Sequence, residues 1–131
     1  MSGLSSFEDL DCWKEAVSLR KKVRSKTKTF PPEEKFRLTD QLIRSTRSVT
    51  ANIAEGFGRY HYQENSQFCR HARGSLNEII DHLIVAAEEN YITDEELSDL
   101  KQQAQKCIHI LNGYINYLQR AKINTNTTRN Q

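Results

Sequence analysis

Glycine, proline and cysteine are all scarce in this chain of 131 residues, which contains five, two and three of them. So few glycines and prolines exclude a strand-and-turn protein and a disordered one. Three scattered cysteines are an odd number, which fits a reducing cytoplasm better than a disulfide framework. No run approaches the roughly 18 apolar residues of a membrane span. Residues 1–6 also lack the basic end and apolar run of a signal peptide. We therefore expect a cytoplasmic protein with no membrane role.

The net charge of +2 hides an asymmetry between the two halves of the chain. Residues 20–73 carry 13 Lys and Arg against 5 Asp and Glu, a balance of +8. Residues 74–131 carry 5 against 8, a balance of −3. A basic half is a candidate surface for anionic partners. A head-to-tail oligomer that pairs the two halves is the alternative, and the two interpretations are compatible.

Apolar residues recur at helical spacing in four segments, near residues 6–28, 32–55, 63–89 and 93–120. Short connections between long helices force antiparallel neighbours. The sequence therefore predicts an all-α fold, an antiparallel up-down-up-down four-helix bundle that forms a single domain over residues 1–120. Residues 121–131 are polar and have no period, so we expect a disordered C-terminal tail.

Two capping boxes are predicted at helix starts. Ser5 with Glu8, and Thr93 with Glu96, have the spacing at which each side chain accepts a hydrogen bond from a free backbone donor at the other residue. The first pair places a helix start near residue 6, and the second places the start of the last helix.

Glycines give two further expectations. Gly56 and Gly58 are expected to end the second helix, because glycine adopts the left-handed cap conformation at little cost. Gly74 lies in the middle of the third helix, where glycine costs about 1 kcal/mol relative to alanine. We therefore expect another backbone to approach closely at Gly74.

The sequence carries no pattern typical of catalysis or metal binding. Di-iron bundles need a Glu-x-x-His pair on each of two helices, whereas Glu78 and His82 are four residues apart and have no second copy. The cysteines lie on or beside apolar stripes, where cysteine behaves as a small hydrophobe. Gly56 and Gly58 lack the rest of a phosphate-loop fingerprint. We expect no enzymatic activity, no catalytic residue, no metal and no cofactor.

Basic residues gather at the end of the first helix, along the second, and around the connection to the third, where Tyr60, His61 and Tyr62 are interleaved. Arginine with aromatic side chains can hold phosphates and stack on unpaired bases. The alternative is a solvated helix face with internal ion pairs, for instance Arg44 with Asp40. The candidate nucleic-acid contacts are Arg20, Lys21, Arg24, Arg44, Arg47, Arg59, Arg70 and Arg73.

Residues 48–59 read SVTANIAEGFGR, which resembles the signature of a bacterial family of four-helix bundles. These proteins are encoded within intervening sequences of 23S ribosomal RNA genes. Other matching elements are Trp13-Lys14-x-Ala16, FPPEE at residues 30–34 and Gly74-Ser75-x-x-Glu78, so the resemblance covers about residues 7–120. The family is also similar in fold to accessory proteins of diversity-generating retroelements, which assist a reverse transcriptase.

The resemblance implies protomers that assemble into a ring-shaped homo-oligomer, typically a pentamer, and a role in binding RNA or DNA. A reverse transcriptase or a ribosomal component stays open as a further partner. Four of the matching positions, residues 52, 55, 56 and 59, lie at a helix end that a neighbouring subunit could cover, so subunit packing explains them as well as ligand contact does. These signature or interface residues are Asn52, Glu55, Gly56, Arg59, Gly74 and Glu78.

We therefore expect a non-enzymatic, homo-oligomeric bundle that binds nucleic acid, structured RNA above all, through phosphate contacts. The competing hypothesis is a homo-oligomeric scaffold or adaptor for protein partners, with no direct nucleic-acid role. Its basic half would meet the acidic half of the next subunit, so that Arg44→Glu would break the oligomer. The acidic residues concerned include Asp94, Glu95, Glu96 and Asp99.

Overall fold

A computed structural model of the chain describes residues 5–129, with side chains through residue 122. Residues 1–4 and 130–131, on which parts of the signal-peptide and tail arguments rest, lie outside this range. Within it every regular element is helical, so the predicted all-α fold with four helices is confirmed. The elements are η1 (Phe7–Asp9), α1 (Asp11–Thr27), η2 (Pro32–Glu34), α2 (Leu38–Phe57), α3 (Tyr62–Glu88) and α4 (Asp94–Arg129), where η marks a single 3-10 turn.

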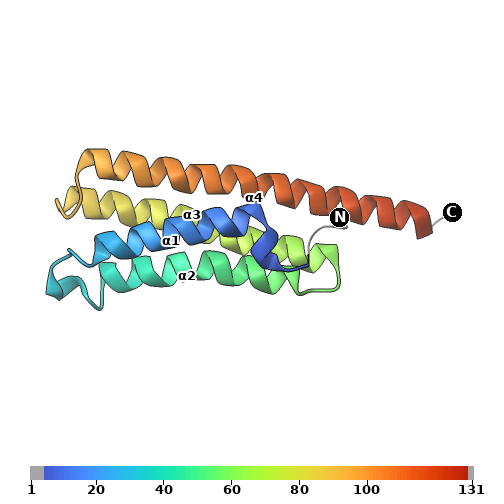
Figure 1. Ribbon diagram of the computed structural model, residues 1–131, viewed down its shortest axis with the longest axis horizontal. Coiled ribbons are helices and arrows are strands. Elements are labelled where there is room, and N and C mark those ends of the chain that lie inside the picture. Colours follow the sequence, from blue (N-terminus) through green and yellow to red (C-terminus); the bar gives the residue numbers. More distant parts are fainter. Residues whose placement is uncertain (1–4, 130–131) are drawn as a thin grey trace.

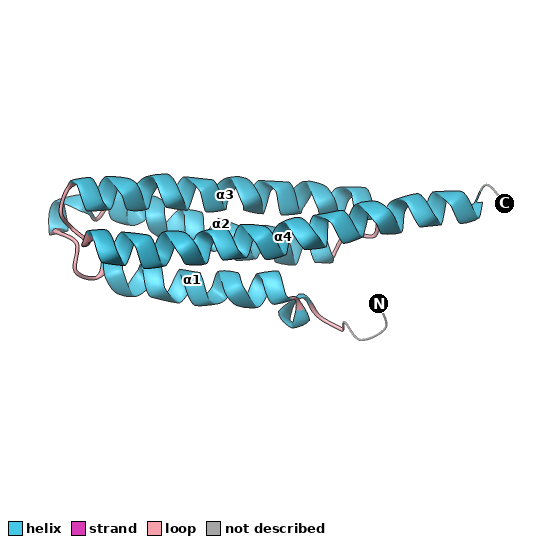
Figure 2. Cartoon of the chain, turned by 90° about the horizontal axis from the view of Figure 1, so that it is seen from above, coloured by secondary structure: helices cyan, strands magenta, loops and turns pink. Residues whose placement is uncertain are grey.

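The four helices lie side by side, and consecutive helices run in opposite directions (Figure 1). Among the described residues, α1 packs against α2 and α4, and α3 packs against the same two helices. The part of α4 nearest the C-terminus extends past the other helices (Figure 2). In the part of the chain that is described, no helix combines the length and the apolar character needed to cross a lipid bilayer.

The predicted apolar stripes meet in one core. Leu19 of α1, Leu42 of α2, Leu83 of α3 and Leu111 of α4 are almost completely buried. Each such leucine removes enough apolar surface from water to stabilise the fold by about 1.5–3 kcal/mol. All three cysteines are free thiols in this core, as their place on the stripes predicted.

The first capping box is shifted by one residue from the prediction. Ser6, not Ser5, is the N-cap of η1, and its hydroxyl accepts a hydrogen bond from the Glu8 amide at 3.1 Å. The reciprocal acceptor is Asp9 Oδ2, which takes the Ser6 amide at 3.2 Å. The difference arises because this segment forms a separate 3-10 turn and α1 begins only afterwards.

The second capping box is confirmed. The Glu96 amide donates to Thr93 Oγ1 at 3.1 Å, and the Thr93 amide donates to Glu96 Oε1 at 2.9 Å. This reciprocal pair satisfies two backbone donors that have no partner inside the helix. It therefore fixes the start of α4.

The second helix differs from the prediction at both ends. Residues 32–34 form their own 3-10 turn, and Arg37 has φ −122° and ψ −109°, outside the helical region, so α2 begins at Leu38. At the other end Gly58 is the C-cap with φ −76°, and no described glycine has a positive φ. The predicted left-handed cap is wrong, because the Gly58 amide bonds to the Ala54 carbonyl at 3.3 Å in right-handed geometry.

The close approach predicted at Gly74 is found at Gly56 instead. A Cβ atom on Gly74 would meet nothing within 4 Å. A Cβ atom on Gly56 would lie 2.7 Å from Asn65 Oδ1 and 2.9 Å from Phe68 Cβ. The α2 and α3 backbones therefore come together near the C-terminal end of α2, and only glycine fits there without a shift.

The helical part of the chain also continues beyond residue 120, where the predicted domain ended. Residues 121–129 belong to α4, although their polar, aperiodic composition predicted a disordered tail. Neither glycine nor proline follows Gly113, so no helix-breaking residue stops the last helix.

Candidate nucleic-acid interface

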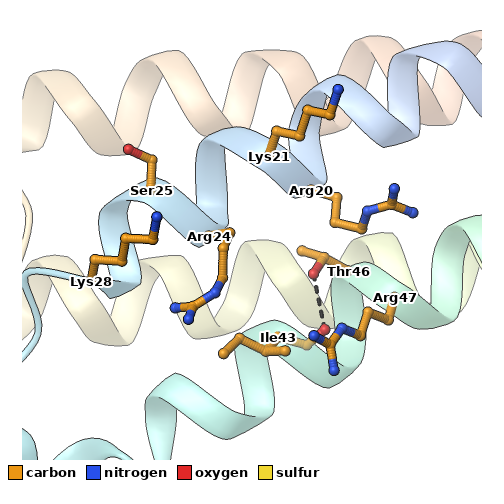
Figure 3. Close-up of a pocket in the computed structure, with 8 residues that line it drawn as sticks. All are labelled: Arg20, Lys21, Arg24, Ser25, Lys28, Ile43, Thr46 and Arg47. Atoms are coloured by element: carbon orange, nitrogen blue, oxygen red, sulfur yellow. Dashed lines mark hydrogen bonds between the residues drawn. The ribbon is translucent and has the colours of Figure 1, made fainter.

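A groove of about 340 Å³ lies between α1 and α2 (Figure 3). Three of its basic residues recur every four positions along α1 and its end, so they share one side of that helix. The side facing them belongs to α2. We call this the basic groove; its lining residues are Arg20, Lys21, Arg24, Ser25, Lys28, Ile43, Thr46 and Arg47.

Hydrogen bonds hold two of the arginines in place. Arg20 Nη1 donates to Thr50 Oγ1 of α2 at 2.7 Å, and Arg24 Nη1 donates to Thr27 Oγ1 at 3.2 Å. A guanidinium has five N–H donors, so each arginine keeps donors for a ligand. The hydroxyl of Thr46 is occupied by the Ile43 carbonyl at 3.0 Å, the dashed contact in Figure 3.

The charge of the basic groove is not compensated. No carboxylate is among the described residues that line it, and none of its five cations forms an ion pair with a described side chain. Five positive charges gathered in one concave surface raise the local concentration of anions. This arrangement can hold an anion that carries several negative charges.

Four of the eight residues predicted to contact nucleic acid lie together in this groove. They are Arg20, Lys21, Arg24 and Arg47. Lys28 also lines the groove but was not among the predicted contacts. Its spacing of four residues from Arg24 is the sequence signal that could have found it.

Arg44 lies one turn before Arg47 but does not line the groove. Its Nε is 3.0 Å from Asp40 Oδ2, and its side chain is 79% exposed. The internal ion pair foreseen as the alternative is therefore confirmed for this residue.

The remaining predicted contacts lie away from the basic groove. Arg73 Nη1 donates to Asn112 Oδ1 of α4 at 2.8 Å, which ties it to the neighbouring helix. Arg70 donates to Gln67 at 3.5 Å and lines a separate cavity beside α4. The structure thus divides the predicted basic cluster between two parts of the surface.

Arg59 belongs to this second part. Its Nη2 donates to Glu55 Oε1 at 2.6 Å, and its guanidinium lies 4.8 Å from the centre of the Phe68 ring. Two signature residues, Glu55 and Arg59, are thereby joined at the end of α2.

Asn52 occupies another position of the signature and faces α3. Its amide donates to the Ser48 carbonyl at 2.8 Å and to Ser48 Oγ at 3.0 Å. Ser48 Oγ in turn accepts a hydrogen bond from Ser75 Oγ of α3 at 2.9 Å. These side chains therefore form a polar link between α2 and α3.

The close approach at Gly56 sets the position of Asn65, a residue that no sequence motif marks. Asn65 is only 6% exposed, and its Nδ2 donates to the Tyr114 hydroxyl at 2.9 Å. Its Oδ1 lies 3.5 Å from the Cys69 thiol. Gly56, Asn65 and Tyr114 thus connect α2, α3 and α4.

The last two signature residues, Gly74 and Glu78, lie on α3. Gly74 is exposed, and Glu78 Oε1 lies 3.3 Å from His82 Nε2 on the same helix.

Among the described residues, no three His, Cys, Asp or Glu side chains are grouped so that they could hold a metal ion.

The cysteines are poor nucleophiles in this environment. Burial raises the pKa of Cys12 to about 11 and the pKa of Cys69 and Cys107 to about 12. Since the thiolate is the reactive form, these thiols act as parts of the core near neutral pH.

The acidic start of α4 meets α1 of the same chain. Lys26 Nζ forms an ion pair and hydrogen bond with Glu96 Oε2. The hydrogen bond from Lys26, followed by that from the Thr93 amide, lowers the pKa of Glu96 to about 2. Asp94, Glu95 and Asp99 remain exposed nearby.

Comparison with known proteins identifies relatives of this chain. The family model described as 23S rRNA-intervening sequence protein matches residues 8–113. A crystal structure of a protein of unknown function from the S23 ribosomal protein family of Bacteroides thetaiotaomicron is similar, with a TM-score of 0.73 and 21% identity. The similarity covers 79% of this chain and 97% of that chain and concerns the fold alone. No curated protein is a significant match.

Proposed function

Because the chain belongs to the family of 23S rRNA-intervening sequence proteins, we propose that it is a non-enzymatic, homo-oligomeric bundle that binds nucleic acid. Its ligand is structured RNA, held through phosphate contacts in the basic groove. The observation that carries this proposal is the gathering of five cations, from α1 and α2, with no carboxylate among them.

The spacing of the cations suits a phosphate backbone. Arg20, Arg24 and Lys28 follow one another at four-residue intervals, so the row extends along about 12 Å of helix at 1.5 Å per residue. One strand of a B-form duplex advances about 3.4 Å along the helix axis per phosphate. The row is therefore long enough to reach more than one phosphate, and each of its two guanidinium groups can bind a phosphate in a two-pronged geometry.

The lining of the groove supports binding without sequence readout. Side chains cannot read base edges in the deep, narrow major groove of an A-form RNA duplex, and unpaired bases are recognised largely by stacking on rings. The basic groove presents cations, two hydroxyl groups and Ile43, and no aromatic ring, asparagine or glutamine. Phosphate contacts position a protein on a duplex but carry no sequence information.

The test is the affinity for a fluorescently labelled RNA duplex, measured by anisotropy for the wild type and for the double variant Arg24→Gln/Arg47→Gln. We expect the double variant to bind about tenfold more weakly or worse, because two charge-assisted contacts are lost. Arg44→Gln is the matched control, since Arg44 lies on α2 outside the groove. Equal affinity of the double variant and the control would refute the proposal.

A second candidate function is the homo-oligomeric scaffold. The exposed acids at the start of α4, Asp94, Glu95 and Asp99, favour it, because their charge complements the basic groove of a neighbouring subunit. In that case the groove variant would change the sedimentation profile of the protein, and the RNA duplex would not bind to the wild type.

A further inference from the structure

Two adjoining cavities of about 210 and 160 Å³ lie where the α2–α3 connection meets α4. Both are lined by Tyr62 and Leu118, so the two cavities are neighbours, and we call them the two lobes of one cleft. None of the described residues that line either lobe carries a carboxylate. We call this the tyrosine cleft; the residues that matter here are Arg59, Tyr62, Ser66, Arg70, Tyr114 and Lys122.

Aromatic rings form much of the larger lobe. Tyr62 is 41% exposed although it lines both lobes, so part of this residue is accessible to a ligand. Tyr114 and Tyr117 stack on each other with ring centres 6.1 Å apart and planes 19° apart. Flat rings at the edge of a cleft are the surfaces on which nucleic-acid bases stack, whatever the base.

Cations border the smaller lobe. Among the residues whose side chains are described, Lys122 Nζ donates one hydrogen bond, to Gln63 Oε1 at 2.9 Å, and Arg70 makes only the long contact to Gln67. Neither forms an ion pair with a described side chain. Both therefore keep donors for a phosphate group.

Two hydroxyl groups inside the cleft keep hydrogen-bonding capacity for a ligand. Ser66 lines the smaller lobe and is 4% exposed, yet its hydroxyl makes no hydrogen bond with any described residue. Buried hydroxyl groups are nearly always hydrogen-bonded, so the orphaned one points to a ligand. The Tyr114 hydroxyl accepts from Asn65, which leaves its own proton to donate. Burial raises the pKa of Tyr114 to about 12, so this proton is present at neutral pH.

We propose that the tyrosine cleft binds an unpaired nucleotide, with its base stacked on Tyr62 and its phosphate on Arg70 and Lys122. Ser66 and Tyr114 then bond to polar atoms of the nucleotide. The cleft complements the basic groove, which has cations but no ring. The groove holds the backbone of paired nucleic acid, and the cleft takes a base that lies outside the duplex. This extends the proposed function to a second, separate site.

The test compares two labelled probes, a hexa-adenylate RNA and a blunt-ended RNA duplex, by anisotropy. Tyr62→Leu should weaken hexa-adenylate binding roughly 5- to 150-fold, the value of one stacked base, and leave duplex binding within about twofold. Tyr62→Phe keeps the ring and should bind as the wild type does. Tyr60→Leu is the matched control, because Tyr60 is 89% exposed and lines neither lobe.

Arg70→Gln, a change of an exposed side chain, should also weaken hexa-adenylate binding and leave duplex binding unchanged.

Competition with adenosine monophosphate separates the two sources of the nucleotide. Displacement of the hexa-adenylate by the monophosphate supports a single nucleotide as sufficient ligand, whereas no displacement supports a nucleotide within a strand. Unchanged hexa-adenylate affinity in Tyr62→Leu, or an equal loss on both probes, overturns the proposal. Failure of the proposed function gives a different result. In that case the RNA duplex does not bind, or its affinity does not depend on Arg24 and Arg47.

Discussion

At the scale of single residues, two helical glycines have opposite surroundings. Gly56 lies against Asn65 and Phe68, where an added Cβ atom would be less than 3.0 Å from both side chains. Gly74 has open space at the same position. The first glycine is required by packing between α2 and α3, and the second only lowers helix propensity.

This contrast gives a matched pair of stability predictions. Gly56→Ala should lower the free energy of unfolding by about 1–3 kcal/mol, the usual cost of overpacking. Gly74→Ala should raise it by up to about 1 kcal/mol, because alanine favours the helix. Urea unfolding followed by circular dichroism measures both free energies. An equal change in the free energy of unfolding of the two variants would contradict the close contact at Gly56.

Glu96 gives a prediction for the pH dependence of stability. Its pKa in the folded protein is about 2, below the ordinary 4.5, because Lys26 and the Thr93 amide bond to its charged form. A lowered folded-state pKa means that this stabilisation is fully present above pH 4.5 and is lost as the pH falls towards 2.

Glu96→Gln should therefore have a lower Tm than the wild type at pH 7, and the difference should shrink as the pH falls from 4.5 towards 2. Glutamine keeps an oxygen for the Thr93 amide, so the variant removes mainly the charge. Thermal unfolding across this pH range measures the effect, with Glu95→Gln as a control whose residue forms no described ion pair. A difference in Tm that stays constant down to about pH 2 would contradict the lowered pKa of Glu96.

At the scale of elements, the sequence predicted the helices well and their ends less well. An apolar stripe such as that of α4 repeats over many turns, so one irregular position does not hide it. The end of a helix depends on one or two hydrogen bonds. Ser6 is the N-cap instead of Ser5 because a 3-10 turn forms there, and a turn of three residues is too short to show a periodic pattern of apolar residues. The Thr93 and Glu96 box was predictable because it directly precedes a long periodic helix.

The candidate site was also predictable only in part. The α1 residues of the basic groove share a helix face through their spacing, so their grouping was predictable. Which residues of α2 face them depends on how the two helices are aligned, and spacing alone did not separate Arg47 from Arg44. Asn65 was not predictable, because its role rests on contacts with Gly56 and with Tyr114, which is 49 residues away.

At the scale of the whole molecule, the basic groove and the exposed acids of α4 lie on one chain of 15.2 kDa. We expect a homo-oligomer with a native mass near five times that value, as the family resemblance implies. Arg44→Glu should leave this mass unchanged, because Arg44 pairs with Asp40 of its own helix. Analytical ultracentrifugation measures it, and dissociation of this variant would favour the scaffold hypothesis instead.

If the basic groove binds the phosphate backbone of RNA, the affinity must depend strongly on the salt concentration. The affinity for an RNA duplex should be measured from about 50 to about 200 mM salt for the wild type and for Arg24→Gln/Arg47→Gln. We predict that log affinity falls steeply with log salt, by about 0.9 per phosphate neutralised as on a B-form duplex, and that the variant has a slope smaller by between about one and about two. A flat response, or a slope that the variant shares with the wild type, would contradict the account.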